Sequence, residues 1–176
     1  MRKNSNQLGY DFFNQDVLIV APELIGMTLV RKYDENSIQR FIITEVEAYR
    51  GAEDLACHAS KGRTARTEVM YQHGGLVYVY LIYGMHWMLN IVTGEPNNPQ
   101  AVLIRGLEDC YGPGRLTKKL SIGKDFYGEN LSTSNRLWVE ECTIKPIIKT
   151  APRIGVDYSG IEWASKPWRF FTNSNK

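Results

Sequence analysis

The first fifty residues change from a helical pattern to a strand pattern. Residues 16–26 begin at Asp16, a residue type that often caps helices, and end at a glycine, which predicts a short helix. Pro22 should break this helix or begin its last turn. Residues 27–33 and 39–49 are rich in β-branched side chains and enclose a polar run, so we expect a β-hairpin here.

A second pair of strand-like segments, residues 76–82 and 86–93, lies further along the chain. Gly84 in the intervening turn can adopt the backbone conformation that a tight turn requires, so this pair predicts another hairpin. Residues 101–108 predict a further strand, and a basic helix is expected near residues 116–120. Strands outnumber helices and are joined as hairpins, which favours the α+β class with a mainly antiparallel sheet.

Composition narrows the class of protein. The chain has 176 residues, of which 43% are hydrophobic and 23% charged, as expected for one globular domain spanning residues 1–176. The longest mainly apolar run, residues 76–85, is about half as long as a membrane helix, and the N-terminus is polar, so neither membrane insertion nor secretion is expected. Three widely spaced cysteines without a Cys-x-x-Cys pair favour a reducing, cytoplasmic environment over a disulfide framework or structural zinc. A net charge of +2 permits an anionic ligand without requiring one.

The strand predicted over residues 41–49 carries two carboxylates. Because side chains alternate along a strand, three polar residues share one face and three apolar residues the other: Glu45, Glu47 and Tyr49 against Ile42, Val46 and Ala48. Repulsion between the carboxylates, together with any burial, would raise at least one carboxyl pKa toward the range useful for a general base. The alternative is a half-exposed strand whose polar face meets water.

The loop after this strand carries polar and basic groups. His58 could orient a substrate, contact a phosphate or donate a proton, or it could be an ordinary hydrogen-bonded loop histidine. Three basic residues follow within eight positions: Lys61, Arg63 and Arg66. They could hold phosphates, although solvated loops are basic about as often. The histidines at positions 58, 73 and 86 form no metal-binding motif, so no metal or other cofactor is expected.

Tyrosines are concentrated around the second predicted hairpin. Tyr78 and Tyr80 share one face of a straight strand, and Tyr83 lies at the turn beside Met85. An aromatic side chain at a hairpin tip could insert between DNA bases, as the apolar wedges of minor-groove proteins do. The alternative is core packing with each hydroxyl hydrogen-bonded, which suits the strand tyrosines better than Tyr83.

Two polar residues, Asn90 and Arg105, interrupt apolar strands. A buried arginine needs a partner, and the Glu47 carboxylate could provide one. The sequence contains no P-loop, dinucleotide-binding glycine motif, Gly-x-Ser-x-Gly or Cys/His nucleophile pattern. Phosphoryl transfer, dinucleotide chemistry and acyl transfer therefore lack their usual signatures.

A series of short motifs resembles the alkyladenine (3-methyladenine) DNA glycosylase family. They occur in the expected order along nearly the whole chain: TEVEAY (44–49), Asp54, CHA (57–59), GRT (62–64), YVY (78–80), YGMH (83–86), LN (89–90), VLIR (102–105), GPGRL (112–116) and PWRF (167–170). So many ordered motifs are a more specific signal than any one of them. The stretch 124–149 matches weakly, and no role is assigned to it.

The resemblance implies a compact single-domain fold, with a curved antiparallel sheet, flanking helices and a protruding β-hairpin. It also implies a monofunctional glycosylase of base excision repair that acts on double-stranded DNA. Such an enzyme flips out an alkylated or deaminated purine, such as 3-methyladenine, 7-methylguanine, hypoxanthine or etheno-adenine. Water then attacks the N-glycosidic bond and leaves an abasic site. We expect a monomer.

Residue roles also follow from the resemblance. Glu47 would be the general base, and Arg105 would help to hold the attacking water. The base pocket would consist of Tyr49, His58, Tyr80 and Asn90, with Asn90 screening base edges. Tyr83 and Met85 would intercalate into the duplex. Five basic residues would contact the DNA backbone: Lys61, Arg63, Arg66, Arg115 and Lys118.

The sequence departs from the family pattern at several positions: Val46 for Thr, Cys57 for Ser or Ala, Thr67 for Asn, and residues 72–75 for a proline-containing turn. Because Glu47, Tyr49 and Arg105 are present, these differences bear on substrate range more than on the reaction.

Two other functions fit parts of the sequence. One is a nucleic-acid-binding module that keeps the wedge but performs no chemistry. The other is a carbohydrate glycosidase that uses Glu45 and Glu47, but two carboxylates side by side on one strand face point at the same side of a sugar, whereas such enzymes flank the bond.

Overall fold

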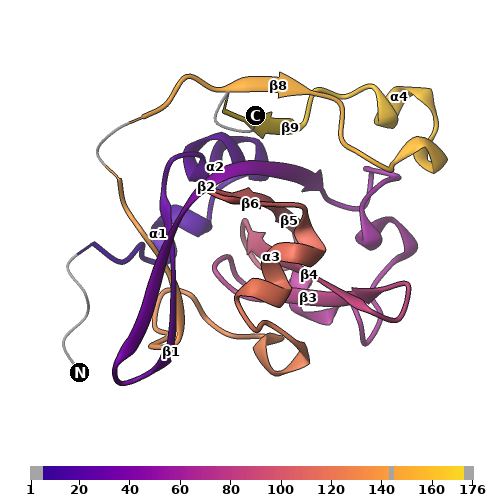
Figure 1. Ribbon diagram of the computed structural model, residues 1–176. Coiled ribbons are helices and arrows are strands. Elements are labelled where there is room, and N and C mark those ends of the chain that lie inside the picture. Colours follow the sequence, from indigo (N-terminus) through magenta and orange to yellow (C-terminus); the bar gives the residue numbers. More distant parts are fainter. Residues whose placement is uncertain (1–5, 143–144, 173–176) are drawn as a thin grey trace.

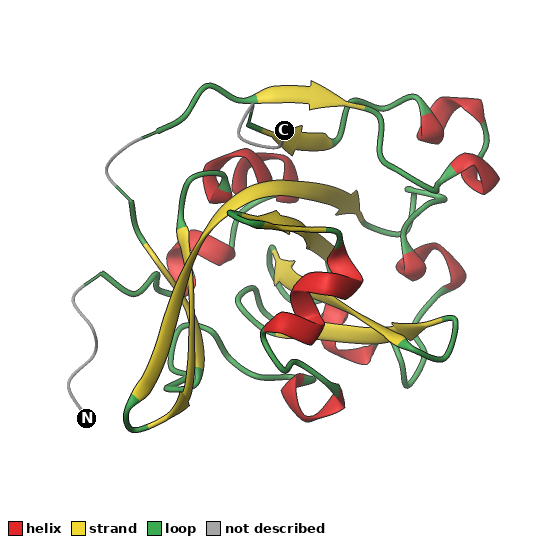
Figure 2. Ribbon diagram, viewed as in Figure 1, coloured by secondary structure: helices red, strands yellow, loops and turns green. Residues whose placement is uncertain are grey.

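The computed structural model describes residues 6–142 and 145–172, which form one α+β domain (Figure 1). An open, curved antiparallel sheet makes up most of the domain, and short helices lie around it (Figure 2). The α+β class and the mainly antiparallel sheet predicted from the sequence are confirmed. None of the helices in the described ranges is long and apolar enough to cross a membrane.

The strands of the described residues belong to one sheet. Their bounds are β1 Thr28–Asp34, β2 Ser37–Arg50, β3 Val77–Ile82, β4 His86–Thr93, β5 Gln100–Leu107, β6 Cys110–Tyr111, β7 Leu137–Glu140, β8 Lys149–Ala151 and β9 Arg169–Phe171. The main path runs β3-β4-β5-β2-β1-β7; β6 pairs with β5, and β9 pairs with both β2 and β8. All of these pairings are antiparallel, and both predicted hairpins, β1–β2 and β3–β4, are confirmed.

The helical segments are short. The α-helices are α1 Tyr10–Phe13, α2 Val17–Leu24, α3 Pro113–Lys119 and α4 Ile161–Ala164, and the 3-10 helices are η1 His58–Lys61, η2 Glu68–Tyr71, η3 Lys124–Phe126 and η4 Asp157–Ser159. The carboxylate of Asp16 accepts the N–H of Leu18 and caps α2, and Pro22 lies in the last turn of that helix, as predicted. Helix α3 confirms the basic helix and begins three residues earlier than expected because Pro113 suits a first helical position.

Strand β2 is the central element of the site, because it is fourteen residues long and changes partners along its length. Its first half pairs with β1, and its second half lies between β5 and β9. A register irregularity at residues 43–46 separates the halves. Such a bulge shifts the alternation of side chains by one position. Ile43, Val46 and Ala48 are consequently buried, whereas Ile42, which a straight strand would place with Val46 and Ala48, is 39% exposed.

The core lies between the sheet and the N-terminal helices. Buried aliphatic side chains of α2, β2, β4 and β5 pack there with Phe13 and Phe126. A second, smaller cluster joins the residues after β2 to β3 and β4 and includes Cys57, Met70 and Tyr78. Three buried members of this cluster, Met70, Tyr78 and Ala101, line the pocket described below.

The C-terminal half contains structure that the sequence patterns did not reveal. Residues 124–149, to which no role was assigned, contain η3 and β7, and β7 pairs with β1 at one end of the main strand path. Residues 153–171 contain η4 and α4 before β9 pairs with β2. This pairing brings β9 beside Glu47.

Candidate active site

Glu47 is a carboxylate with no exposed surface in the middle of the sheet. Its Oε1 accepts the main-chain N–H of Ile154 at 2.8 Å, and its Oε2 accepts the hydroxyl of Tyr49 at 2.9 Å. Burial raises the pKa of Glu47 above its usual value, although the Arg105 guanidinium and both hydrogen bonds oppose the shift. The predicted rise in a carboxyl pKa is confirmed, with burial as the main cause and repulsion from Glu45 as a lesser one.

Arg105 on β5 contacts both carboxylates of β2. Its Nε lies 3.3 Å from Oε1 of Glu45 and 3.7 Å from Oε1 of Glu47, which confirms the predicted pairing with Glu47. Arg169 on β9 contacts Glu45 from the other side at 2.9 Å. The two carboxylates therefore meet at one arginine and do not face each other across a gap. This arrangement lacks the flanking geometry of a carbohydrate glycosidase.

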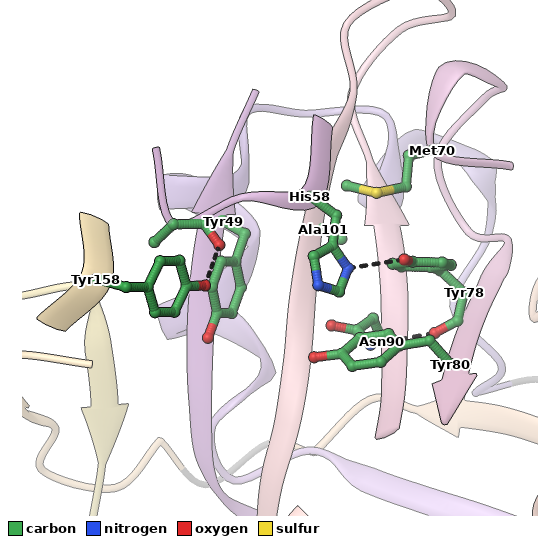
Figure 3. A pocket seen from close by; sticks show the side chains of 9 residues that line it. Tyr49, His58, Met70, Tyr78, Tyr80, Asn90, Ala101 and Tyr158 are labelled. Carbon is green, nitrogen blue, oxygen red and sulfur yellow. Dashed lines mark hydrogen bonds between the residues drawn. The ribbon is translucent and has the colours of Figure 1, made fainter. Parts of the chain in front are cut away.

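A pocket of about 330 Å³, including its open mouth, lies beside Tyr49 (Figure 3). Its lining is aromatic with a few polar groups and consists of Tyr49, Ala56, His58, Met70, Tyr78, Tyr80, Asn90, Ala101 and Tyr158. The structure thus brings together all four predicted pocket residues. Glu47 lies directly behind the wall, since Tyr49 both lines the pocket and hydrogen-bonds to Glu47.

His58 is neutral in this pocket. Burial, reinforced by the positive charges of Arg66 and Lys61, lowers the pKa of His58 to about 4. Its Nδ1 is 2.8 Å from the hydroxyl of Tyr78, and its ring packs edge-on against Tyr80 with centroids 4.6 Å apart. In Figure 3 the imidazole projects between Tyr49 and the Tyr78–Tyr80 pair. His58 can therefore offer a hydrogen bond to a ligand without adding charge.

Asn90 is fixed at the base of the pocket. Its side-chain amide donates to the carbonyls of Tyr78 and Met88 at 3.2 and 3.3 Å, and the residue is buried. Both amide hydrogens are engaged by the protein, so its free polar group toward the pocket is the carbonyl oxygen.

The turn between β3 and β4 presents two large apolar side chains to solvent. Tyr83 is 84% exposed and Met85 is 69% exposed. Tyr83 also has a positive φ of 52°, which is uncommon for a bulky residue. Gly114 at the start of α3 packs closely against His86, so this basic helix lies against the same hairpin. The tip and the helix thus form parts of one surface.

The five basic residues predicted to contact DNA have different environments. Lys61, Arg115 and Lys118 are exposed. The guanidinium of Arg63 is bound by both carboxylate oxygens of Glu68, at 2.8 and 2.6 Å, and stacks on Tyr71. Arg66 stacks over Tyr80 with 4.8 Å from guanidinium carbon to ring centroid, which places it at the pocket.

Several site residues were missed by the sequence analysis. Ile154 and Tyr158 come from the segment before α4; Tyr158 lines the pocket and donates its hydroxyl to the carbonyl of Ala56 at 3.1 Å. Arg153 forms a buried ion pair with Asp54 next to them. About a hundred residues separate each of these contacts along the chain, and no local pattern could have revealed them.

Comparison with known proteins identifies the family. A family model described as methylpurine-DNA glycosylase matches residues 11–111 and 106–176, which together span most of the chain. The chain belongs to the methylpurine-DNA glycosylase family. Accordingly it is a DNA glycosylase, and the resemblance stated from its motifs is confirmed.

Individual relatives of this glycosylase cover almost the same span. A protein of Desulfitobacterium hafniense (strain Y51) is 40% identical over 198 residues, covering 97% of both chains. One of Borrelia garinii subsp. bavariensis is 42% identical over 178 residues, 94% of this chain and 95% of the relative. One of Psychrobacter cryohalolentis is 39% identical over 178 residues, 85% and 84% of the two chains. All three are provisionally named 3-methyladenine DNA glycosylase.

Proposed function

We propose that this glycosylase removes methylated purines, including 3-methyladenine, from double-stranded DNA by hydrolysis of the N-glycosidic bond, leaving an abasic site. The observation that carries the proposal is the buried Glu47 carboxylate, hydrogen-bonded through Tyr49 to the wall of an aromatic pocket. Family membership and the provisional names of the relatives support the same reaction.

Glu47 serves as the general base in this mechanism. Burial raises the pKa of Glu47, which strengthens its carboxylate as a proton acceptor. Cleavage of a glycosidic bond passes through an oxocarbenium-like state, so a nearby carboxylate both takes the proton of the attacking water and stabilises positive charge on the sugar. Arg105, beside Glu47, helps to hold that water.

The pocket receives the flipped base. A base inside a duplex cannot reach a catalytic group, so the nucleotide must rotate out of the helix. Tyr49 and Tyr80 would stack on the extruded purine, His58 would supply a neutral hydrogen bond, and the Asn90 carbonyl would test its edge. Both His58 and Asn90 line the pocket in fixed orientations.

The exposed hairpin tip fills the gap that the flipped base leaves. Tyr83 and Met85 stand free of the protein core, as apolar wedges do in proteins that unstack a base step. Lys61, Arg115 and Lys118 would bind phosphates without sequence preference, and Arg66 would do so at the pocket mouth. Arg63 would contribute less because Glu68 occupies its guanidinium.

We infer a monofunctional reaction and a broader set of substrates. A glycosylase that also cleaves the strand uses an amine nucleophile, and none of the described pocket-lining residues is a lysine. Hypoxanthine, etheno-adenine and 7-methylguanine would be accepted alongside 3-methyladenine, since the pocket wall is aromatic and carries no carboxylate of its own. The enzyme would act as a monomer on DNA in the cytoplasm.

Base release from a set of duplexes that each contain one damaged purine tests this proposal. Duplex oligonucleotides with a single 7-methylguanine, hypoxanthine or etheno-adenine are incubated with excess enzyme, and free base and strand breaks are measured separately. The proposal predicts release of the methylated base and an intact strand until alkali is added. Tight binding to every lesion without release of any base would instead indicate a binding module.

A further inference from the structure

Arg153 and Asp54 form a buried ion pair beside the site, outside the roles assigned so far. Both side chains have no exposed surface. The pair is bidentate: Nη1 of Arg153 lies 2.5 Å from one Asp54 oxygen, and Nη2 lies 2.9 Å from the other. A buried ion pair is weak evidence for stability, since apolar side chains in its place are often as stable. Its location therefore needs another explanation.

Each partner anchors a different wall of the pocket. Asp54 also accepts the main-chain N–H groups of Arg50 and Ala56 at 3.1 and 3.0 Å, and this fixes the loop that carries Ala56 and His58. Arg153 belongs to the opposite segment, whose Tyr158 reaches back to the carbonyl of Ala56. The ion pair thus joins the two segments next to the pocket.

Arg153 also contacts the strand that carries the general base. Its Nη1 donates to the carbonyl of Ala48, the residue between Glu47 and Tyr49, at 3.0 Å. Its guanidinium carbon lies 4.8 Å from the centroid of the Tyr49 ring. The next residue, Ile154, donates its amide to Glu47. A single side chain therefore connects the two residues that hold the Glu47 carboxylate.

We propose that Arg153, held by Asp54, is a positioning residue that keeps the Ile154 amide on Glu47 and the Tyr49 ring against the pocket. The inference rests on the proposed function, because it assigns Glu47 the role of base. Arg153 touches neither the pocket nor the reacting atoms; it acts through Ile154 and Tyr49. Losing the arginine would let the segment move away from Glu47, and displacement of a catalytic group by about 1 Å can cost roughly 100-fold in rate.

A change in the Ile154 contact would alter the pH dependence of the reaction. The hydrogen bond from Ile154 favours ionised Glu47, so its loss raises the Glu47 pKa and moves the acid limb of the rate profile to higher pH. The other ionisable groups that face Glu47 or contact its neighbours are Glu45 and Tyr49 on β2, Arg105 on β5, Arg169 on β9, Tyr80 on β3 and Tyr158 in η4. None of these is changed in the variants below.

The test variant is Arg153→Lys, which keeps the positive charge but cannot make the bidentate pair and the Ala48 contact together. The matched control is Arg31→Lys. Arg31 is also buried, donates to the carbonyls of Leu120, Lys32 and Arg136, and stacks on two aromatic rings. It pairs in β1 with Gln39, eight residues and about 26 Å along β2 from Glu47.

Single-turnover base release is measured from pH 5 to 9, together with Kd for lesion DNA and Tm. We expect Arg153→Lys to release base about 10- to 100-fold more slowly at neutral pH, with an acid limb at higher pH and a Kd close to wild type. Arg31→Lys should lower Tm and leave the rate and the acid limb unchanged. If Arg153→Lys lowers Tm in the same way but keeps the wild-type rate and acid limb, its role is only structural and the proposal fails.

A second readout does not depend on activity. The pKa of Glu47 is measured by following its carboxyl carbon by NMR as the pH is changed, in wild type and in Arg153→Lys. Asp54→Asn is measured as well, so that the test can still be made if Arg153→Lys does not fold. A higher Glu47 pKa in either variant supports the proposal, and an unchanged one contradicts it. Wild-type protein that releases no base would refute the proposed function instead, while this titration would still decide whether Arg153 positions Glu47.

Discussion

Ile154 donates its main-chain amide to the carboxylate of Glu47 at 2.8 Å, although 107 residues separate the two along the chain. The contact exists because β9 pairs with β2 and draws the preceding segment over the sheet. Tyr49 holds the other carboxylate oxygen. The carboxylate of the proposed general base is therefore fixed from two sides before DNA binds, which is the preorganisation that an effective catalytic group needs.

Replacing Tyr49 with phenylalanine should make base release more sensitive to acid. The hydroxyl of Tyr49 lowers the pKa of Glu47, so its removal raises that pKa further. A general base is active when deprotonated, so the acid limb of the single-turnover rate should move to higher pH in Tyr49→Phe. The aromatic wall remains, and lesion-DNA affinity should change by no more than about twofold. Tyr33→Phe, a change on β1, is the control and should match wild type in both measurements; an unshifted acid limb in Tyr49→Phe would show that the hydroxyl does not tune the base.

His58 should remain neutral across the working pH range. Its folded-state pKa is lowered to about 4 from 6.5, so the stability associated with its neutral form is present above pH 6.5 and is lost as pH falls through about 4. Imidazole ¹⁵N shifts should stay constant between pH 8 and about 5.5. Arg66→Ala should raise the His58 pKa, because the Arg66 charge opposes protonation. Titration of His58 near 6.5 in the wild type would refute this description of the pocket.

Tyr83 should contribute to the affinity for lesion DNA and not to the stability of the fold. Its side chain is 84% exposed, so Tyr83→Ser should change the free energy of unfolding by less than about 0.5 kcal/mol. Loss of a stacking wedge should weaken binding to a lesion duplex by about 1–3 kcal/mol, measured by fluorescence anisotropy. Ile19→Ser removes an exposed apolar side chain from α2 and provides the control. Equal affinities for the two variants would show that the hairpin tip does not enter the duplex.

The basic residues should contribute unequally to the salt dependence of DNA binding. Arg115 and Lys118 are exposed on α3 and form no ion pair within the described parts of the chain, so each should be free to neutralise one phosphate. Alanine at either position should reduce the slope of log K against log salt by about 0.9. Arg63→Ala should reduce it less, because Glu68 already neutralises that guanidinium. If Arg63→Ala reduced the slope by about 0.9 and Arg115→Ala left it unchanged, Arg63 and not Arg115 would be the residue that neutralises a phosphate.

Local patterns were enough to predict most of the sheet. The β1–β2 hairpin, the turn at Gly84 and the Asp16 cap are each determined by residues close together in the chain, and the structure contains all three. The position of Ile42 could not be predicted in this way, because the bulge at residues 43–46 depends on pairing with β5. Strand β7 also depends on a partner, since four residues without strong alternation become a strand only beside β1.

The site also contains residues that local patterns could predict and residues that only long-range contacts bring together. Glu47, Tyr49, His58 and Tyr80 lie on predicted strands or the loop between them, and the pocket brings the last three together. Arg153, Ile154 and Tyr158 reach the site through contacts that span about a hundred residues. Burial, which sets the Glu47 pKa, is likewise a property of the assembled sheet and is absent from any single strand.

The central claim, that Glu47 is the general base of a glycosylase, is tested most directly by comparing wild type with Glu47→Gln. Single-turnover release of free base is measured from a duplex with one 7-methylguanine, and binding to the same duplex is measured in parallel. We expect Glu47→Gln to bind as tightly as wild type, because the amide keeps an acceptor for Ile154, and to release base at least about 100-fold more slowly. Release at the wild-type rate from the Glu47→Gln variant would contradict the account.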